Sequence, residues 1–239
     1  MSGDAERNLR ANARDLGKTP LARIPRRIER ACFLLINTNR SYRLNSGQAP
    51  INRGVKVAEM FKSFGYEVFF MLNPHLIMFT EYFSLFLQRT TEHLFFAKIG
   101  DGGEPGDQSI IFDDEPLEDT QFIQLVSDNK SAGLEMTILS DFSNEKSVFE
   151  QLDSFDQNTV LIACIGDESQ ILEGPEKLIT QFTREVTNRN QISNQQLYDS
   201  LRIVIKRSGL RLSVLGSADS LAKPVAIYRP TVERNELIH

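Results

Sequence analysis

The sequence predicts an α/β fold in which a largely parallel, six-stranded sheet lies between two layers of helices. Short apolar segments alternate with amphipathic segments along most of the 239 residues. Several apolar segments are hydrophobic on both faces, which is typical of strands that helices cover on each side. The chain is long enough to form a substantial core, so it needs neither a metal nor disulfides to fold.

Six short apolar segments are the predicted strands. The first two, Ala31–Ile36 and Glu67–Leu72, are separated by a polar stretch, 37–53, and by a helix that Gly65 ends. The other four are 93–99, 134–139, 159–164 and 211–215. Ligands of open parallel sheets bind beyond the carboxyl ends of the strands. We therefore expect the functional site in the segments that follow the third, fourth and fifth strands.

Helix and turn signals fill the spaces between these strands. Asn73 and Pro74 predict a helix start, with Asn as the cap and Pro in the first turn. Three more helices are expected over 116–130, from Gly174 and from Ser193, and a hairpin arm is expected over 109–112.

Charge is distributed unevenly along the chain. Residues 1–30 carry eight basic and four acidic side chains, a net charge of +4, which leaves −9 for the rest of a chain whose total is −5. We interpret 1–30 as a basic N-terminal arm and 31–239 as one domain. The arm either folds back on the acidic body or binds a partner or an anionic surface.

Composition argues against several classes of protein. The two cysteines, Cys32 and Cys164, cannot form a disulfide framework and favour a reducing compartment. No apolar stretch predicts a transmembrane helix, and the N-terminal sequence lacks the apolar region of a signal peptide. We therefore expect a cytoplasmic protein with no membrane span, and the acidic balance argues against nucleic-acid binding.

Other sequence features give little support for cofactor or metal chemistry. Gly100–Gly106 follows a strand, as a phosphate-binding loop does, but it lacks the GxxxxGK[ST] pattern. Nucleotide binding therefore stays an alternative, and we expect no cofactor. The acidic run at 113–119 lacks EF-hand spacing, so no metal site is predicted. His75, His93 and His239 do not follow the strands that end at the expected site, so no histidine is expected to act there as a base.

Several motifs, in order, resemble those of the caspase and metacaspase clan of cysteine peptidases over roughly residues 31–226. The first strand with the Gly-Tyr-Glu-Val segment before the second is similar to the opening of that clan. The third strand is similar to the one ending in SGHG, the fourth to the one ending in DxCHSG, and the fifth to the ISACxDD strand. The matching segments are 31–36, 54–61, 64–68, 93–102, 136–144 and 159–169. The resemblance implies a caspase-like three-layer sandwich.

The departures from this pattern fall on the catalytic dyad. Asp101 stands where the family has its histidine, and Ser143 stands where it has the nucleophilic cysteine. A serine hydroxyl needs a base, and a carboxylate with a reference pKa near 3.9 is a weak one. Losing one member of such a pair typically costs on the order of 10⁶ in rate. We therefore expect a catalytically inactive pseudopeptidase.

The resemblance also implies a pocket for a basic side chain. Asp141, Cys164 and Asp167 match positions at or near that pocket. They either hold a basic peptide or are acids that stabilise loops.

The expected function is protein binding. The partner is either an active caspase- or metacaspase-like peptidase, which the chain would regulate, or a protein that uses it as a scaffold. The alternatives are a weak hydrolase that depends on Ser143 and a nucleotide-binding switch. The sequence leaves the partner, the oligomeric state and calcium binding open.

Overall fold

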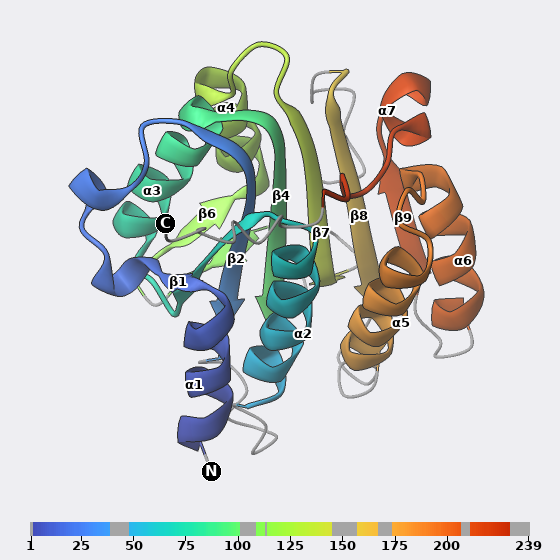
Figure 1. Cartoon of the computed structure of the whole chain (residues 1–239), viewed down its shortest axis with the longest axis horizontal. Coiled ribbons are helices and arrows are strands. Elements are labelled where there is room, and N and C mark those ends of the chain that lie inside the picture. Colours follow the sequence, from blue (N-terminus) through green and yellow to red (C-terminus); the bar gives the residue numbers. More distant parts are fainter. Residues whose placement is uncertain are drawn as a thin grey trace, which may run out of the picture.

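A computed structural model describes residues 2–38, 48–100, 109–112, 114–144, 157–166, 174–206 and 211–229. A seven-stranded sheet in the order β1-β3-β2-β4-β7-β8-β9 forms the middle layer (Figure 1). Every neighbouring pair is parallel except β8 and β9. The strands are β1 Arg14–Asp15, β2 Ile28–Asn37, β3 Glu67–Leu72, β4 Thr90–Gly100, β7 Glu135–Asn144, β8 Thr159–Gly166 and β9 Arg211–Leu215.

This architecture confirms the predicted three-layer fold and corrects the count of six strands. The additional strand is β1, which pairs Arg14 and Asp15 with Phe69 and Phe70 at the edge of the sheet. Two residues are too few to show a hydrophobic period, so the strand left no signal in the sequence.

Helices cover both faces of the sheet (Figure 1). One layer is formed by α1 Ser2–Asn12, α2 Ala49–Ser63, α5 Gly174–Asn188 and α6 Asn194–Lys206. The other is formed by α3 Leu76–Arg89, α4 Asp119–Asn129 and the predicted hairpin, β5 Ser109–Ile111 with β6 Pro116–Glu118. The short helix α7, Ala218–Ala222, follows β9. Each layer has its own apolar core because the side chains of the strands alternate between the two faces.

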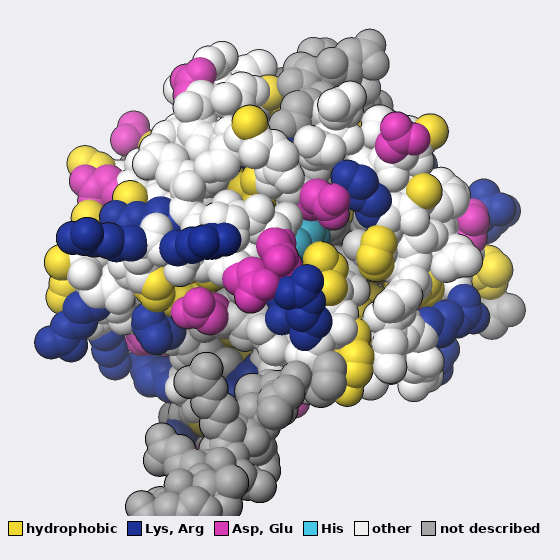
Figure 2. Space-filling model, turned by 45° about the horizontal axis from the view of Figure 1, so that its top comes forward, with side chains coloured by type: hydrophobic (Ala, Val, Ile, Leu, Met, Phe, Trp, Pro, Cys, Tyr) yellow, Lys and Arg dark blue, Asp and Glu magenta, His cyan; other side chains and the backbone are white. Residues whose placement is uncertain are grey.

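The basic N-terminal arm folds against the body. Leu9, Leu16 and Ile24 are buried, and α1 packs along α2. Apolar burial and the β1 pairing therefore hold the arm in place. Its basic side chains are exposed, except for that of Arg30, which is buried at the start of β2. Figure 2 shows Lys and Arg side chains gathered at the left of the view, on the side where Figure 1 places this segment.

Three helix starts differ from their predictions. The helix expected over 116–130 begins at Asp119, because Pro116–Glu118 pairs with β5 as strand β6. The helix expected from Asn73 begins at Leu76, because Asn73 has a φ of 47° and its side chain instead binds Thr38. The helix before Gly65 begins at Ala49, inside the stretch that was expected to be a loop. Gly65 itself has a φ of 79°, as a glycine that ends a helix often does.

Candidate functional site

The carboxyl ends of β2 and β4 lie side by side at the expected edge of the sheet. Asn37 and Gly100 are partners in the parallel register. Gly100 has a φ of 140°, and a Cβ atom on it would lie 2.3 Å from the carbonyl oxygen of Asn37. Only glycine fits this position, because a side chain would meet backbone that cannot move aside.

A β-bulge shapes the neighbouring strand at the same edge. Ser140 pairs with Ala163, whereas Ser143 pairs with Ile165, so two residues of β7 lie opposite Cys164 alone. Those two are Asp141 and Phe142. Bulges are common next to functional sites, where they bend a strand and re-aim its side chains.

Asp141 lies at this bulge and is completely buried. Its Oδ2 accepts a hydrogen bond from Nε of Arg53 at 2.8 Å, and its Oδ1 accepts one from the backbone N–H of Gly100 at 3.1 Å. Arg53 extends from α2, and only 6% of its side chain is exposed. Both carboxylate oxygens of Asp141 are therefore bound from within the chain.

Lys98 adds a second buried cation at this edge. Strand alternation directs it toward the α4 layer, since Ala97 and Ile99 belong to the core on the α2 side. Burial lowers the pKa of Lys98, and the carboxylates of Asp119 and Asp141 oppose that effect. Burial likewise raises the pKa of Asp141, against the opposing effects of Arg53, the Gly100 N–H and Lys98. Two buried cations, Arg53 and Lys98, and two buried acids, Asp119 and Asp141, thus lie near the ends of β4 and β7.

Cys164 shares the edge with Asp141 but is a poor nucleophile. Burial, together with the smaller effect of the negative charge of Asp141, raises its pKa to about 12. A thiol with this pKa stays protonated at neutral pH, and only the thiolate attacks a carbonyl. Cys32, within β2, is also buried, and burial raises the pKa of its thiol.

The structure brings some of the predicted site residues together. Asp141 and Cys164 lie close enough to interact electrostatically. The backbone of Ser143 lies in β7 beside Ile165, but its side chain is outside the described part of the structure. Asp101 and Asp167 are also outside the described residues. The geometry of the degenerate dyad therefore stays a prediction.

Arg53 was missed by the sequence analysis because the preceding polar stretch was interpreted as a loop as far as residue 53. A usable signal was present. Pro50 fits the first turn of a helix, and helical spacing from Ile51 to Val55 and Ala58 extends that helix to include Arg53.

A second polar cluster occupies the opposite, amino edge of the sheet. His93 is buried, its Nδ1 lies 2.8 Å from Oη of Tyr66, and its Nε2 lies 3.1 Å from Oγ1 of Thr137. The Tyr66 hydroxyl also accepts a hydrogen bond from the N–H of Ile227 at 3.0 Å, so it joins His93 to the C-terminal segment. Burial, together with the smaller effect of the positive charge of Arg30, lowers the pKa of His93 to about 3. His93 is therefore a neutral structural residue.

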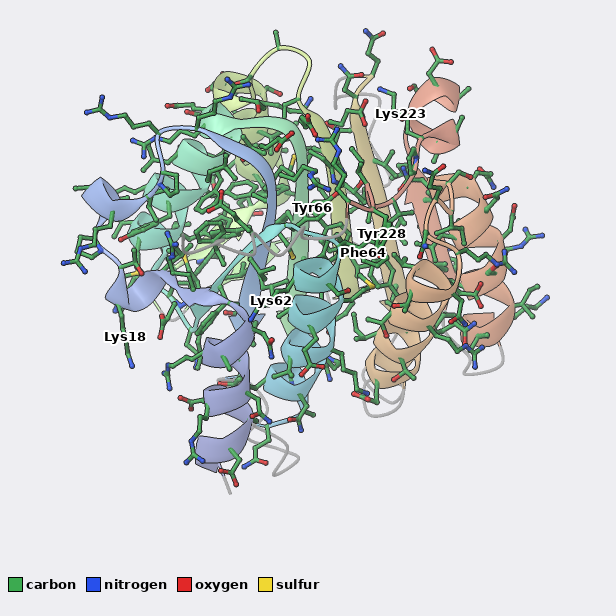
Figure 3. The ribbon with its side chains drawn as sticks, in the orientation of Figure 1. Lys18, Lys62, Phe64, Tyr66, Lys223 and Tyr228 are labelled. Carbon is green, nitrogen blue, oxygen red and sulfur yellow. The ribbon has the colours of Figure 1, made fainter. Side chains whose placement is uncertain are left out.

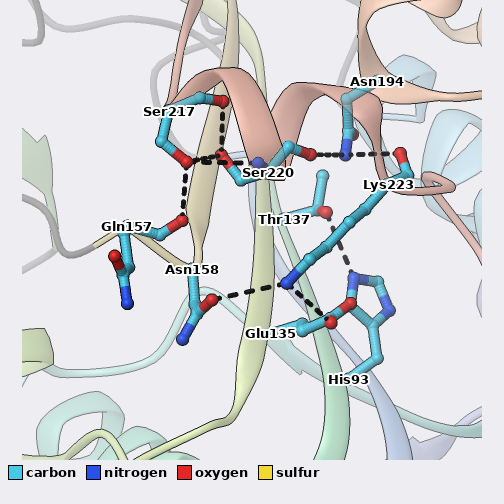
Figure 4. Close-up of polar contacts among 9 residues, drawn as sticks. All are labelled: His93, Glu135, Thr137, Gln157, Asn158, Asn194, Ser217, Ser220 and Lys223. Atoms are coloured by element: carbon cyan, nitrogen blue, oxygen red, sulfur yellow. Dashed lines mark hydrogen bonds and ion pairs between the residues drawn. The ribbon is translucent and has the colours of Figure 1, made fainter.

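Ion pairs and caps join the C-terminal part of the chain to this amino edge (Figure 4). Nζ of Lys223 lies 2.9 Å from Oε1 of Glu135. Oγ of Ser217 caps α7 by accepting the N–H of Ser220. Asn194 donates to the carbonyl oxygens of Ser220 and Lys223. These contacts fix α7 against α6 and β8 and are structural.

Two further observations limit the chemistry of the described residues. They contain no group of three or more His, Cys, Asp or Glu side chains that could hold a metal ion. None of the helices in the described ranges combines the length and the apolar character that crossing a bilayer requires.

Comparison of the sequence with family models gives no match, and comparison with curated proteins gives none either. Solved structures do match the fold. The Drosophila initiator caspase Dronc superposes with a TM-score of 0.59 at 12% identity, covering 85% of this chain and 84% of that one. The structure of pro-sf-caspase-1 superposes with a TM-score of 0.57 at 6% identity, covering 83% of this chain and 95% of the other. The fold is caspase-like.

Proposed function

We propose that this chain is a catalytically inactive caspase-fold protein that acts by binding another protein. The fold and the sequence at its carboxyl edge support the proposal. Asp101 and Ser143 occupy the positions that the resemblance assigns to the dyad. A serine with only a carboxylate as its base is a poor acylation catalyst.

The observation that carries the proposal furthest is the internal pairing of Asp141. The resemblance assigns this acid to a pocket for a basic side chain, and Arg53 of the same chain already holds it. A basic side chain from outside would have to displace a guanidinium that is buried together with its carboxylate. Breaking a buried pair in this way typically costs 3–5 kcal/mol. Asp141 therefore serves the stability of the edge, which leaves the outer surface as the functional part of the molecule.

The proposal is tested by recovering the tagged chain from its own cells after cross-linking and assaying the recovered material for peptidase activity. A stoichiometric partner with peptidase activity would identify a regulator of an active homologue. A stoichiometric partner without peptidase activity would identify a scaffold. The absence of any partner, together with cleavage by the purified chain that Ser143→Ala abolishes, would contradict the proposal.

A further inference from the structure

The second half of the N-terminal arm, residues 16–28, carries four cations and no acid. The cations are Lys18, Arg23, Arg26 and Arg27, and the side chains of all four are exposed. Figure 3 shows Lys18 at the outer side of the arm. Figure 2 shows Lys and Arg side chains gathered on the side of the molecule where Figure 1 places this segment. The segment therefore presents its positive charge to the solvent.

The inner side of the same segment is fixed to the body. Leu16, Ile24 and Ile28 are buried in the apolar core that α3 covers. The hydroxyl of Tyr82, on α3, donates a hydrogen bond to the carbonyl oxygen of Thr19, the residue after the first cation. The exposed cations are thus displayed on a backbone that is held in place, and they do not belong to a loose tail.

Arg89 adds a fifth cation beside the other four. Its Nη1 donates to the carbonyl oxygens of Ile24 at 3.0 Å and Pro25 at 3.4 Å, which lie in the chain between two of the exposed arginines. Tyr82 and Arg89 are seven residues apart and so lie on one side of α3, about 10 Å apart along its axis. The segment therefore runs along one side of this helix. We call the resulting surface the basic face: Lys18, Arg23, Arg26, Arg27 and Arg89.

The positive charge of the basic face is weakly compensated from within the chain. Nζ of Lys18 lies 3.9 Å from Oδ2 of Asp15, but Nε of Arg10 already binds that oxygen at 3.2 Å. In the part of the chain that the structure describes, the four arginines of the basic face have no carboxylate within ion-pair distance. Their charges are therefore available to a ligand.

Acidic side chains near the basic face are few. Glu29 follows the segment directly, but its Oε1 is bound by Nη1 of Arg229 at 2.7 Å. The helix α3 contributes one acid, Glu81. One unpaired acid beside five cations leaves the surface strongly positive.

We propose that the basic face binds the surface of an anionic lipid bilayer. A cluster of about four to eight Lys and Arg residues is typical of proteins that bind phosphatidylserine or phosphoinositide headgroups. Headgroups are mobile and gather beneath separate cations, so the site needs an exposed positive surface and no pocket on which the cations converge. Pro20 and Ala22, exposed between the cations, add a small apolar contact. The proposal goes beyond protein binding and is independent of whether the chain cleaves peptides.

The composition of the surface favours a bilayer over a single-stranded nucleic acid. Among the described residues the exposed large apolar side chains are Ile77, Ile203 and Tyr228, so the basic face offers no aromatic ring on which a base could stack. The charge distribution also orients the molecule. Residues 31–239 carry a net charge of −9, which an anionic bilayer repels, so contact through the basic face turns most of the body away from the lipid.

Co-sedimentation of the full chain with lipid vesicles tests the proposal. The vesicles contain phosphatidylcholine alone or phosphatidylcholine with phosphatidylserine. The variants are Arg26→Gln/Arg27→Gln and, as an independent single change, Lys18→Gln. The control is Arg184→Gln/Lys206→Gln, which removes two exposed cations from α5 and α6, in the other helix layer, and gives the same net charge as the double variant. Thermal melting without lipid checks the folding of each protein.

The wild type should bind the vesicles that contain phosphatidylserine and leave those of phosphatidylcholine alone. Binding should weaken as the salt concentration rises, because salt screens exposed charges. Each cation removed from the basic face should weaken binding by about fivefold, which gives about fivefold in Lys18→Gln and about 25-fold in Arg26→Gln/Arg27→Gln. The control Arg184→Gln/Lys206→Gln should bind as the wild type does.

Three results would overturn the proposal. The first is that the wild type shows no preference for vesicles with phosphatidylserine. The second is an equal loss in the control, which would show that binding follows net charge and not this face. The third is tighter binding to a polyglutamate peptide or a single-stranded RNA than to the vesicles, at equal concentration of negative charge. That result would assign the basic face to an acidic protein or to a nucleic acid.

Discussion

Arg53 of α2 and Asp141 of β7, 88 residues apart in the chain, form a buried ion pair with an Nε–Oδ2 distance of 2.8 Å. The pair joins the first helix after β2 to the bulge at the end of β7. It satisfies the acid that the resemblance assigns to a substrate pocket. We expect this one contact both to stabilise the edge of the sheet and to keep Asp141 from binding a basic side chain of a substrate.

Replacing Arg53 should destabilise the protein strongly. Arg53→Met leaves the Asp141 carboxylate buried without its partner, and we expect a loss of about 3–5 kcal/mol in the free energy of unfolding. Urea denaturation measures it. Arg202→Met is the matched control, because Arg202 is exposed and lies 3.7 Å from Asp199, and it should cost at most about 1 kcal/mol.

The double variant Arg53→Met/Asp141→Asn should lose less stability than the two single variants together, because the uncompensated charge is gone. If the loss of stability in the double variant equalled the sum of the losses in the two single variants, the two residues would not act as a pair.

Gly100→Ala should cost more than Gly133→Ala. Both glycines have positive φ, 140° and 83°, so alanine strains the backbone at either position. A Cβ on Gly133 meets nothing within 4 Å, whereas on Gly100 it lies 2.3 Å from the Asn37 carbonyl oxygen. We expect about 1 kcal/mol at Gly133 and at least about 2 kcal/mol more at Gly100 in thermal unfolding. Equal losses would show that β2 and β4 are not so closely apposed at this edge.

Stability should fall as the solution becomes acidic, in part because of His93. Its folded pKa is about 3, against an unfolded value near 6.5, so below pH 6.5 the unfolded state binds a proton that the folded state does not. This group alone should remove about 2 kcal/mol of stability between pH 7.5 and pH 5.0. Urea denaturation of the wild type and of His93→Gln at pH 7.5 and at pH 5.0 measures how much of the loss of stability is due to His93. An identical pH dependence in the two proteins would refute the assignment of His93 as a buried neutral residue.

Tyr66→Phe should loosen the segment that crosses the amino edge of the sheet. The Tyr66 hydroxyl is bound to His93 and to the N–H of Ile227, and its removal leaves both groups without this partner. We expect a loss of about 1–3 kcal/mol and faster hydrogen exchange at the Ile227 amide. Tyr228→Phe is the control, since Tyr228 is 39% exposed and packs against Phe64 through its ring. Unchanged exchange at Ile227 in Tyr66→Phe would contradict the hydrogen bond.

The sequence predicts the framework better than the site. All six apolar segments became strands, because strands buried on both faces require continuous hydrophobic runs. The two-residue strand β1 carries no such run, and its place depends on the packing of α1 on α2. Asp141 was found through the resemblance, but its partner was not. Contacts between residues as distant as Arg53 and Asp141 are fixed by how a helix crosses the sheet, and no local pattern encodes that crossing.

The most direct test of the central claim is the difference in cleavage rate between the purified wild type and Ser143→Ala. A peptide library with basic and acidic cleavage sites, with and without calcium, covers the specificities of caspase-fold peptidases. The variant Asp101→His/Ser143→Cys restores the histidine and the cysteine of the family, and it shows whether the fold can still support cleavage. We predict no difference between wild type and Ser143→Ala on any peptide. Turnover by the wild type that disappears in Ser143→Ala would contradict the account and establish a serine peptidase on a caspase-like fold.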